Sequence, residues 1–249
     1  MAIFRAENLK KSFSQRWVVK GVNLKVHSGE IISLLGANGA GKTTTFHMMV
    51  GLLKPDSGAI YLDDRNISRF TTSQRADSGI TYLPQENSVF LKTTVENNLK
   101  LVIEFFEKNK KNVDKIAQDL LEELGLSELA KQSAHSLSGG ERRRLEICRS
   151  LVLNPKFLLL DEPFTGIDPI TIIELQKILL RLKEKGIGVI LSDHNVRDAL
   201  KITDRAYIIE AGEILVEGSP HEVASDEKAR THFLGKDYHL GDEVGSYSS

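Results

Sequence analysis

The sequence has few of the features that mark secreted, membrane-spanning or nucleic-acid-binding chains. Its single cysteine, Cys148, excludes a disulfide within the chain, which is typical of a reducing compartment. No apolar run approaches the roughly 20 residues that cross a bilayer, and the N-terminus lacks an apolar signal-peptide stretch. The 33 Lys and Arg residues balance 34 Asp and Glu residues, which disfavours general affinity for nucleic acid or anionic lipid. We therefore expect a cytoplasmic protein that reaches membranes only through partner proteins and binds no nucleic acid.

Short apolar runs alternate with helical patterns, which favours an α/β fold with a mostly parallel sheet. The clearest buried strands are predicted at 31–35, 80–83, 157–160 and 189–191. Alternating stretches at 4–9 and 18–26 predict an antiparallel β edge at the N-terminus. We expect a single domain over 1–240, with a core of about 1–90 and 155–235, an α-helical insertion of about 91–154, and a polar flexible tail over 241–249.

A glycine-rich segment between a predicted strand and a predicted helix matches the pattern G-x-x-x-x-G-K-[ST]. Its glycines allow backbone N–H groups to point at a phosphate, and the helix N-terminus adds favourable polarity. Lys42 would contact the β- and γ-phosphates of ATP, and Thr43 would offer a hydroxyl to Mg²⁺. The alternative is a strand-to-helix turn that binds nothing. The phosphate-binding segment comprises Gly36, Ala37, Asn38, Gly39, Ala40, Gly41, Lys42, Thr43 and Thr44.

Two consecutive carboxylates, Asp161 and Glu162, follow the apolar strand predicted at 157–160. Ligands of open α/β sheets bind at this end of the strands. Asp161 is predicted to bind Mg²⁺, and Glu162 to orient and polarise the attacking water. Such a pair alone is usually a solvated turn, so its catalytic interpretation depends on the phosphate loop earlier in the chain.

The segment 137–141, Leu-Ser-Gly-Gly-Glu, contains the capping box Ser138–Glu141 of a predicted helix. Gly139 and Gly140 leave N–H groups at this helix end open to a γ-phosphate. The segment resembles the signature motif of ABC-type ATPases. This resemblance implies a RecA-like P-loop NTPase core, ATP and Mg²⁺ as cofactors, and a head-to-tail dimer. In that dimer the signature residues of a second copy complete each ATP site.

The family resemblance extends over nearly the whole chain and assigns roles to four further residues. Phe13 resembles the aromatic residue that stacks on adenine, with Trp17 as a weaker competitor, and Gln85 resembles the glutamine that touches Mg²⁺ and links core and insertion. Asp168 resembles the aspartate of the loop that signals across the dimer, although it is also a predicted helix N-cap. His194 resembles the histidine that contacts the γ-phosphate. Each residue alone would more often be structural.

Within that family the sequence resembles the ATPases of bacterial lipopolysaccharide-export (Lpt) systems, most distinctively in the Gly-Glu-Arg-Arg-Arg run at 140–144. The alternative for this run is a solvated basic helix face. The resemblance implies a location on the cytoplasmic face of the inner membrane. It also implies two transmembrane permease subunits that bind a groove near 85–91, lined by Ser88, Val89, Phe90 and Leu91. A branched-chain amino-acid importer ATPase and a soluble non-transport ABC protein remain alternatives.

Overall fold

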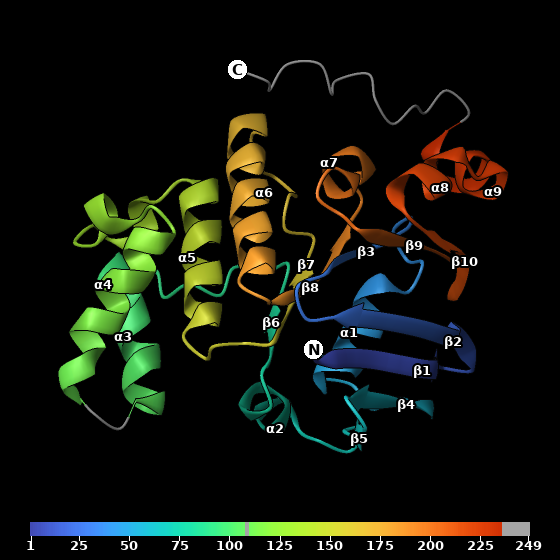
Figure 1. Ribbon diagram of the computed structural model, residues 1–249, viewed down its shortest axis with the longest axis horizontal. Coiled ribbons are helices and arrows are strands. Elements are labelled where there is room, and N and C mark those ends of the chain that lie inside the picture. Colours follow the sequence, from blue (N-terminus) through green and yellow to red (C-terminus); the bar gives the residue numbers. More distant parts are fainter. Residues whose placement is uncertain (108–109, 236–249) are drawn as a thin grey trace.

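The computed structural model describes residues 1–107 and 110–235, which form two sheets with helices between and beside them (Figure 1). Within these residues the larger sheet has the strand order β10-β9-β3-β8-β7-β6, and only β10 pairs antiparallel. A mostly parallel sheet is therefore confirmed. Its strands are β3 (Ile31–Leu35), β6 (Ile80–Leu83), β7 (Phe157–Asp161), β8 (Gly188–Asp193), β9 (Arg205–Glu210) and β10 (Glu213–Gly218).

The predicted antiparallel edge belongs to a separate four-stranded sheet with the order β2-β1-β4-β5. Its strands are β1 (Ile3–Phe13), β2 (Arg16–His27), β4 (Ser57–Leu62) and β5 (Arg65–Asn66). Sequence analysis did not predict β4 and β5. Only Ile60 and Leu62 are buried in β4, and both residues of β5 are exposed, so the alternation is too short to stand out.

The helix α1 (Lys42–Val50) lies between the two sheets (Figure 1). Phe46, Met48 and Met49 of α1 are fully buried in a core cluster with residues of both sheets. The rings of Phe4 and Phe157, one from each sheet, lie 5.5 Å apart in this cluster. The phosphate-binding segment is therefore followed by a helix that packs on both sides.

Three helices that lie within 91–154 stand beside this core: α3 (Val95–Phe106), α4 (Val113–Glu123) and α5 (Gly139–Leu151) (Figure 1). Leu99 and Ile103 of α3 are buried, as their helical spacing implies, whereas Phe106 is half-exposed. The division into a core and an insertion stays a prediction, and the predicted tail at 241–249 lies outside the described residues.

The remaining helices lie beside the core. α6 (Pro169–Glu184) buries Leu175, Leu179 and Leu182. Asp168 caps α6, and its side chain accepts from the Thr171 amide at 3.0 Å. No helix among the described residues has the length and apolar character needed to cross a bilayer. The shorter helices are α2 (Thr72–Asp77), α7 (Val196–Leu200), α8 (Pro220–Ser225) and α9 (Glu227–Ala229).

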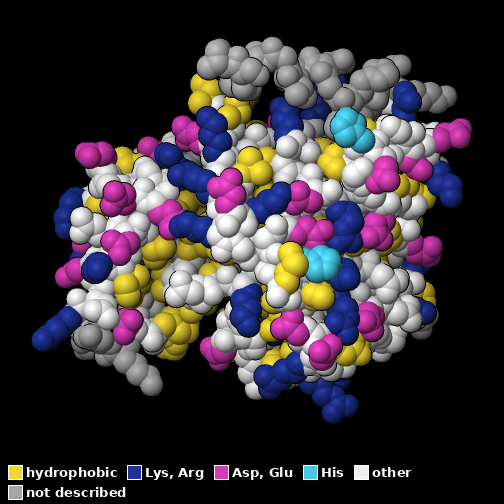
Figure 2. Space-filling model, viewed as in Figure 1, with side chains coloured by type: hydrophobic (Ala, Val, Ile, Leu, Met, Phe, Trp, Pro, Cys, Tyr) yellow, Lys and Arg dark blue, Asp and Glu magenta, His cyan; other side chains and the backbone are white. Residues whose placement is uncertain are grey.

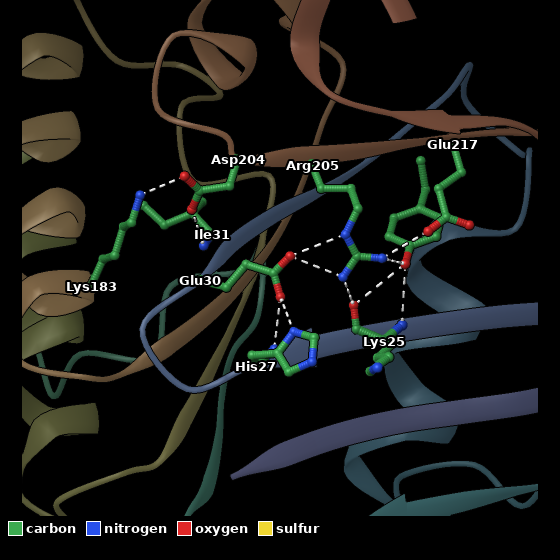
Figure 3. Close-up of polar contacts among 9 residues, drawn as sticks. Lys25, His27, Glu30, Ile31, Lys183, Asp204, Arg205 and Glu217 are labelled. Carbon is green, nitrogen blue, oxygen red and sulfur yellow. Dashed lines mark hydrogen bonds and ion pairs between the residues drawn. The ribbon is translucent and has the colours of Figure 1, made fainter. Parts of the chain in front are cut away.

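A polar cluster joins the two sheets where the parallel strands β3 and β9 begin (Figure 3). The Arg205 guanidinium lies 2.9 Å from a Glu30 carboxylate oxygen and 2.7 Å from one of Glu217, and it donates to the Lys25 carbonyl at 2.7 Å. Asp204 pairs with Lys183 of α6 at 2.5 Å. Glu30, Glu217 and Asp204 therefore each have a cationic partner.

Candidate functional site

The phosphate-binding segment connects β3 to α1 in a conformation that requires glycine. Gly39 and Gly41 have φ of +80° and +110°, a region that other residues rarely adopt. A Cβ on Gly36 would overlap the carbonyl oxygen of Ile209. The backbone therefore requires glycine at Gly36 and Gly41, as the sequence pattern does, and favours it at Gly39 as well.

Lys42 begins α1 and is 5% exposed. Its ammonium donates to the carbonyls of Gly36 and Ala37 at 2.7 and 3.1 Å. Burial lowers the pKa of Lys42, and the nearby carboxylates of Glu162 and Asp161 partly oppose that shift. The lysine thus lies inside the loop, beside acidic groups with which it forms no ion pair.

A cavity of about 490 Å³ opens in front of the loop. It brings together residues from both halves of the chain, and these include the phosphate loop, Gln85, Glu162 and His194. Among the described residues that line it, none comes from the signature segment 137–141. The lining residues are Val18, Asn38, Gly39, Gly41, Lys42, Thr43, Thr44, Gln85, Glu162, Thr165 and His194.

Asp161 ends β7 and is 1% exposed. The hydroxyl of Ser192 donates to its Oδ1, and the hydroxyl of Tyr82 donates to its Oδ2 at 3.3 Å. Neither donor is charged. A carboxylate oxygen has more than one lone pair, so each oxygen of Asp161 can also accept a further ligand.

Glu162 is the first residue after β7 and has φ of +48°, a strained value for a non-glycine residue. Gln85 and Thr165 donate to its Oε2 at 2.9 and 3.1 Å, and Nδ1 of His194 lies 3.4 Å from the same oxygen. Two other predicted catalytic residues, Gln85 and His194, therefore converge on one carboxylate oxygen of Glu162. The strained backbone aims that carboxylate into the cavity.

Asp193, the residue before His194, is fully buried at the end of β8. Its carboxylate accepts from the amides of Phe164 and Asn195 at 3.1 and 2.8 Å. Burial raises the pKa of Asp193, and these backbone hydrogen bonds partly oppose the shift. Asp193 therefore fixes the turn that presents His194.

The signature segment forms the N-terminus of α5. The predicted capping box is present: Ser138 accepts from the Glu141 amide at 3.2 Å, and Glu141 accepts from the Ser138 amide at 2.8 Å. A Cβ on Gly140 would overlap Cγ2 of Thr171, whose hydroxyl donates to Asp168 at 2.6 Å. The N-terminal ends of α5 and α6 are thus in contact, with Ser138 and Gly139 exposed beside Asp168.

The basic run after the signature is not a fully solvated face. Arg143 is 6% exposed and donates to the carbonyls of Pro84 and Asp161 at 3.0 and 3.1 Å. Glu146 pairs with Arg143 at 3.0 Å and accepts from the Ser88 amide at 2.7 Å. The solvated alternative is therefore wrong for Arg143. Side chains of α5 hold the segment around Gln85 in place.

Phe13 and Trp17 are both about half exposed on the hairpin of β1 and β2. Phe13 lies opposite Arg16 and Ser12 lies opposite Trp17. Directly opposed residues share a face and successive residues alternate, so Phe13 and Trp17 lie on opposite faces of the hairpin. Neither lines the cavity in front of the phosphate loop, and the choice of Phe13 for adenine stays a prediction.

The segment predicted to bind membrane partners is only partly exposed. Phe90 and Leu91 are 49% and 38% exposed, and Arg149 of α5 stacks on the Phe90 ring at 4.5 Å. Val89 is buried in the core, so its predicted place in the groove lining is wrong. Figure 2 shows a recess beside the helices, with hydrophobic side chains on its helical side.

The sequence did not predict the contacts of several residues that hold the site together: Tyr82 and Ser192 on Asp161, Thr165 on Glu162, and Arg143 on Pro84. Arg143 lies in the basic run at 140–144, and Tyr82 and Ser192 lie within three residues of Gln85 and His194 respectively. Their proximity to these predicted residues was the available signal.

Comparison with known proteins places this geometry in a family. The ABC transporter family profile matches residues 19–165. Lipopolysaccharide export system ATP-binding protein LptB of Haemophilus influenzae is 47% identical over 241 residues, covering 96% of this chain and 100% of that protein. The LptB protein of Escherichia coli K12 is 46% identical with the same coverage.

Solved structures agree with this assignment. The ADP conformation of MJ1267, an ATP-binding cassette of an ABC transporter, has a TM-score of 0.84 and 31% identity, covering 95% of this chain and 100% of that chain. The ATP-binding cassette MJ0796, a dimer bound to ADP and Pi, has a TM-score of 0.78 and 25% identity, covering 87% and 98%. The P-loop NTPase fold is therefore confirmed.

Proposed function

This chain belongs to the ABC transporter family, and from that premise we propose that it is the ATP-hydrolysing subunit of a transporter that exports lipopolysaccharide from the bacterial inner membrane. The convergence of Gln85, His194 and Thr165 on the Glu162 carboxylate, in a cavity that the phosphate loop lines, carries the enzymatic part. The similarity to LptB proteins favours lipopolysaccharide export over the importer and non-transport alternatives.

The groups in the cavity fit Mg²⁺-ATP. The triphosphate would lie against the N–H groups of 36–44 and the Lys42 ammonium. Mg²⁺ prefers hard oxygen donors, and Thr43, Gln85 and Asp161 offer a hydroxyl, an amide oxygen and a carboxylate. When bound, the ion would neutralise phosphate charge. Among the described residues the side-chain donors to Asp161 are two neutral hydroxyls, so its oxygens can still bind such an ion.

Glu162 is the general base of this proposal. Its carboxylate is held by Gln85 and Thr165 and lies at the cavity wall, where it would orient a water molecule and accept a proton from it. His194 lies at 3.4 Å from the same carboxylate, is half-exposed, and would donate to the γ-phosphate. Positioning and charge stabilisation dominate phosphoryl transfer, so this preorganised cluster suits the reaction.

Ser138 and Gly139 are exposed at the α5 N-terminus, and the signature segment does not line the cavity of its own chain. We infer that a second copy supplies these residues, head to tail, with Phe13 on adenine and Asp168 at the contact between copies. The dimeric cassette MJ0796 supports the pairing of two copies. Size-exclusion chromatography of Glu162→Gln should show a dimer with Mg²⁺-ATP and a monomer without it. A monomer under both conditions would reject the shared site.

The partner proposal rests on Phe90 and Leu91, which are exposed beside the Gln85 segment. Exposed apolar side chains that lie next to each other often mark a protein contact. We propose that two transmembrane permease subunits of an Lpt system dock here and hold the protein on the cytoplasmic face of the inner membrane. Ser88 and Phe90 contact Glu146 and Arg149 of α5, and Glu146 pairs with Arg143, which donates to the Asp161 carbonyl.

The test is a pull-down from detergent-solubilised membranes, with the bound proteins identified by mass spectrometry. Lpt permeases should co-purify with the native chain and with Phe105→Glu, a control at an 82% exposed position of α3. Phe90→Glu should lose them and keep nucleotide binding. Recovery of amino-acid importer permeases or ribosomes would replace the export assignment, and retention by Phe90→Glu would remove the docking site.

A further inference from the structure

Tyr82 is the third residue of β6 and has no role in the proposal above. Its register partner in β7 is Leu159, two residues before Asp161. The hydroxyl of Tyr82 nevertheless reaches Oδ2 of Asp161 at 3.3 Å. The side chain therefore lies along β7 and ends at the carboxylate that we assign to Mg²⁺.

Asp161 depends on few donors for its orientation. It is 1% exposed, and the two side-chain donors to its carboxylate are the hydroxyls of Tyr82 and Ser192, one on each oxygen. No Lys or Arg side chain within the described residues forms an ion pair with it. A buried carboxylate held by two fixed hydroxyls has a defined rotamer, and removing either donor frees it to turn.

The ring of Tyr82 also contacts α1. It meets the ring of His47 edge to face, with centroids 5.9 Å apart and planes at 89°. His47 follows Thr43 by four residues, so both lie on the same face of α1. Tyr82 thus touches the strand that ends at Asp161 and the helix that carries Thr43.

We propose that Tyr82 is a positioning residue for the nucleotide's divalent cation. Its hydroxyl orients the Asp161 carboxylate and its ring fixes α1, so that Asp161 and Thr43 face the same ion. This inference rests on the proposed function. Outer-shell partners of metal-binding carboxylates act in this way, and their removal weakens metal binding without removing a ligand.

The two contacts of Tyr82 use different parts of the side chain: the hydroxyl donates to Asp161 at 3.3 Å, and the ring meets His47. A tyrosine that only filled the core would contribute its ring, and Phe would replace it without effect on metal binding.

Tyr82→Phe keeps the ring against His47 and removes only the hydroxyl. In the full chain, binding of a fluorescent, non-hydrolysable ATP analogue is titrated with Mg²⁺ and, separately, measured in EDTA. The half-saturating Mg²⁺ concentration should rise about tenfold, the lower end of the usual cost of removing an outer-shell partner. Affinity in EDTA should stay native. Tyr61→Phe is the matched control, because Tyr61 lies on β4 and stacks with Arg5 at 4.5 Å, away from the cavity.

An unchanged Mg²⁺ requirement in Tyr82→Phe would overturn the positioning role. An equal loss of affinity with and without Mg²⁺ would also overturn it, because it would indicate a general effect on folding or on the phosphate loop. Asp161→Asn is measured in parallel. If Asp161→Asn keeps the native half-saturating Mg²⁺ concentration, the assignment of Asp161 to the metal site is wrong. If that concentration changes in Asp161→Asn but not in Tyr82→Phe, only the positioning role of Tyr82 is wrong.

Discussion

The carboxylates at the two ends of the parallel sheet have different partners. Where β3 and β9 begin, Glu30 and Glu217 pair with Arg205, and Asp204 pairs with Lys183 (Figure 3). Where β7 and β8 end, the carboxylates of Asp161, Glu162 and Asp193 form no ion pair with Lys or Arg among the described residues. Their donors are hydroxyls, an amide side chain and backbone N–H groups, and His194 lies beside two of them.

This difference indicates that the carboxylates at one end stabilise the fold, whereas those at the other end serve function. Paired acids at the first end are compensated within the chain, so they join the two sheets at little electrostatic cost. The acids at the second end form no ion pair with Lys42, whose ammonium donates to loop carbonyls although these acids act on it electrostatically. Such a cluster is suited to a bound cation and its phosphates. Carboxylates that stabilise the fold and carboxylates that bind ligand can therefore be told apart by their donors.

The largest expected effect is on turnover, at the ligand end. Glu162→Gln removes the proposed base and should slow steady-state ATP hydrolysis about 10²–10⁴-fold, the usual share of general base catalysis, while ATP binding is retained. The matched change at the other end, Glu217→Gln, should leave the rate native. Equal rates for Glu162→Gln and native protein would reject the role of Glu162.

The next effect is on nucleotide affinity. Lys42→Ala removes a buried cation from the phosphate site and should weaken ATP binding about 10–100-fold, as expected for lost hydrogen bonds to a charged group. Lys183→Ala, which breaks the pair with Asp204, should bind ATP as the native chain does. Titration with a fluorescent ATP analogue measures the ATP affinity of both variants. Similar losses of affinity in the two would contradict a functional difference between the two ends of the sheet.

Substitutions at the end where β3 and β9 begin should lower stability and not activity. Arg205→Met leaves Glu30 and Glu217 without their guanidinium and should lower the free energy of unfolding by about 1–3 kcal/mol, less than a fully buried pair because Arg205 is partly exposed. Lys20→Met, which breaks an exposed pair with Glu213 at 3.9 Å, should change it by less than about 1 kcal/mol. Urea unfolding gives both values. A large loss of ATPase activity per folded Arg205→Met molecule would contradict a purely stabilising role for this end of the sheet.

The smallest effect concerns a paired acid away from both ends. Hydrogen bonds from Lys11 and Ser12 lower the pKa of Asp56 from 3.8 to about 2. A lowered folded-state pKa stabilises the fold above pH 4, and this contribution is lost as pH falls towards 2. Native protein should therefore lose its small advantage in thermal stability over Asp56→Asn across that window. A difference that is constant from pH 6 to about 2 would contradict the assigned pairing.

The strands β3, β6, β7 and β8 and the phosphate loop could be predicted because their signals are local. Ile31–Leu35 is wholly apolar except for Ser33, and the loop that follows needs glycine for its own backbone. Asp168 and the Ser138–Glu141 box were predictable as helix caps for the same reason.

Contacts between distant segments could not be predicted in this way. The hydroxyls of Tyr82 and Ser192 meet on Asp161 only through the registers of β6, β7 and β8, which local pattern does not fix. From the sequence alone Arg143 is expected at the surface, and its burial follows only from the packing of α5 against the Gln85 segment. Val89 is likewise expected in the groove lining, but it is buried in the core. The partners of a site residue depend on tertiary packing, even where the residue itself lies in a motif.

The most direct test of this account compares one carboxylate from each end. Mn²⁺ binding in the presence of a non-hydrolysable ATP analogue is followed by electron paramagnetic resonance in native protein, Asp161→Asn and Glu217→Gln. Asp161→Asn should bind Mn²⁺ at least about tenfold more weakly, and Glu217→Gln should match the native chain. Native Mn²⁺ affinity in Asp161→Asn would contradict the claim that the unpaired carboxylates exist to hold the nucleotide's cation.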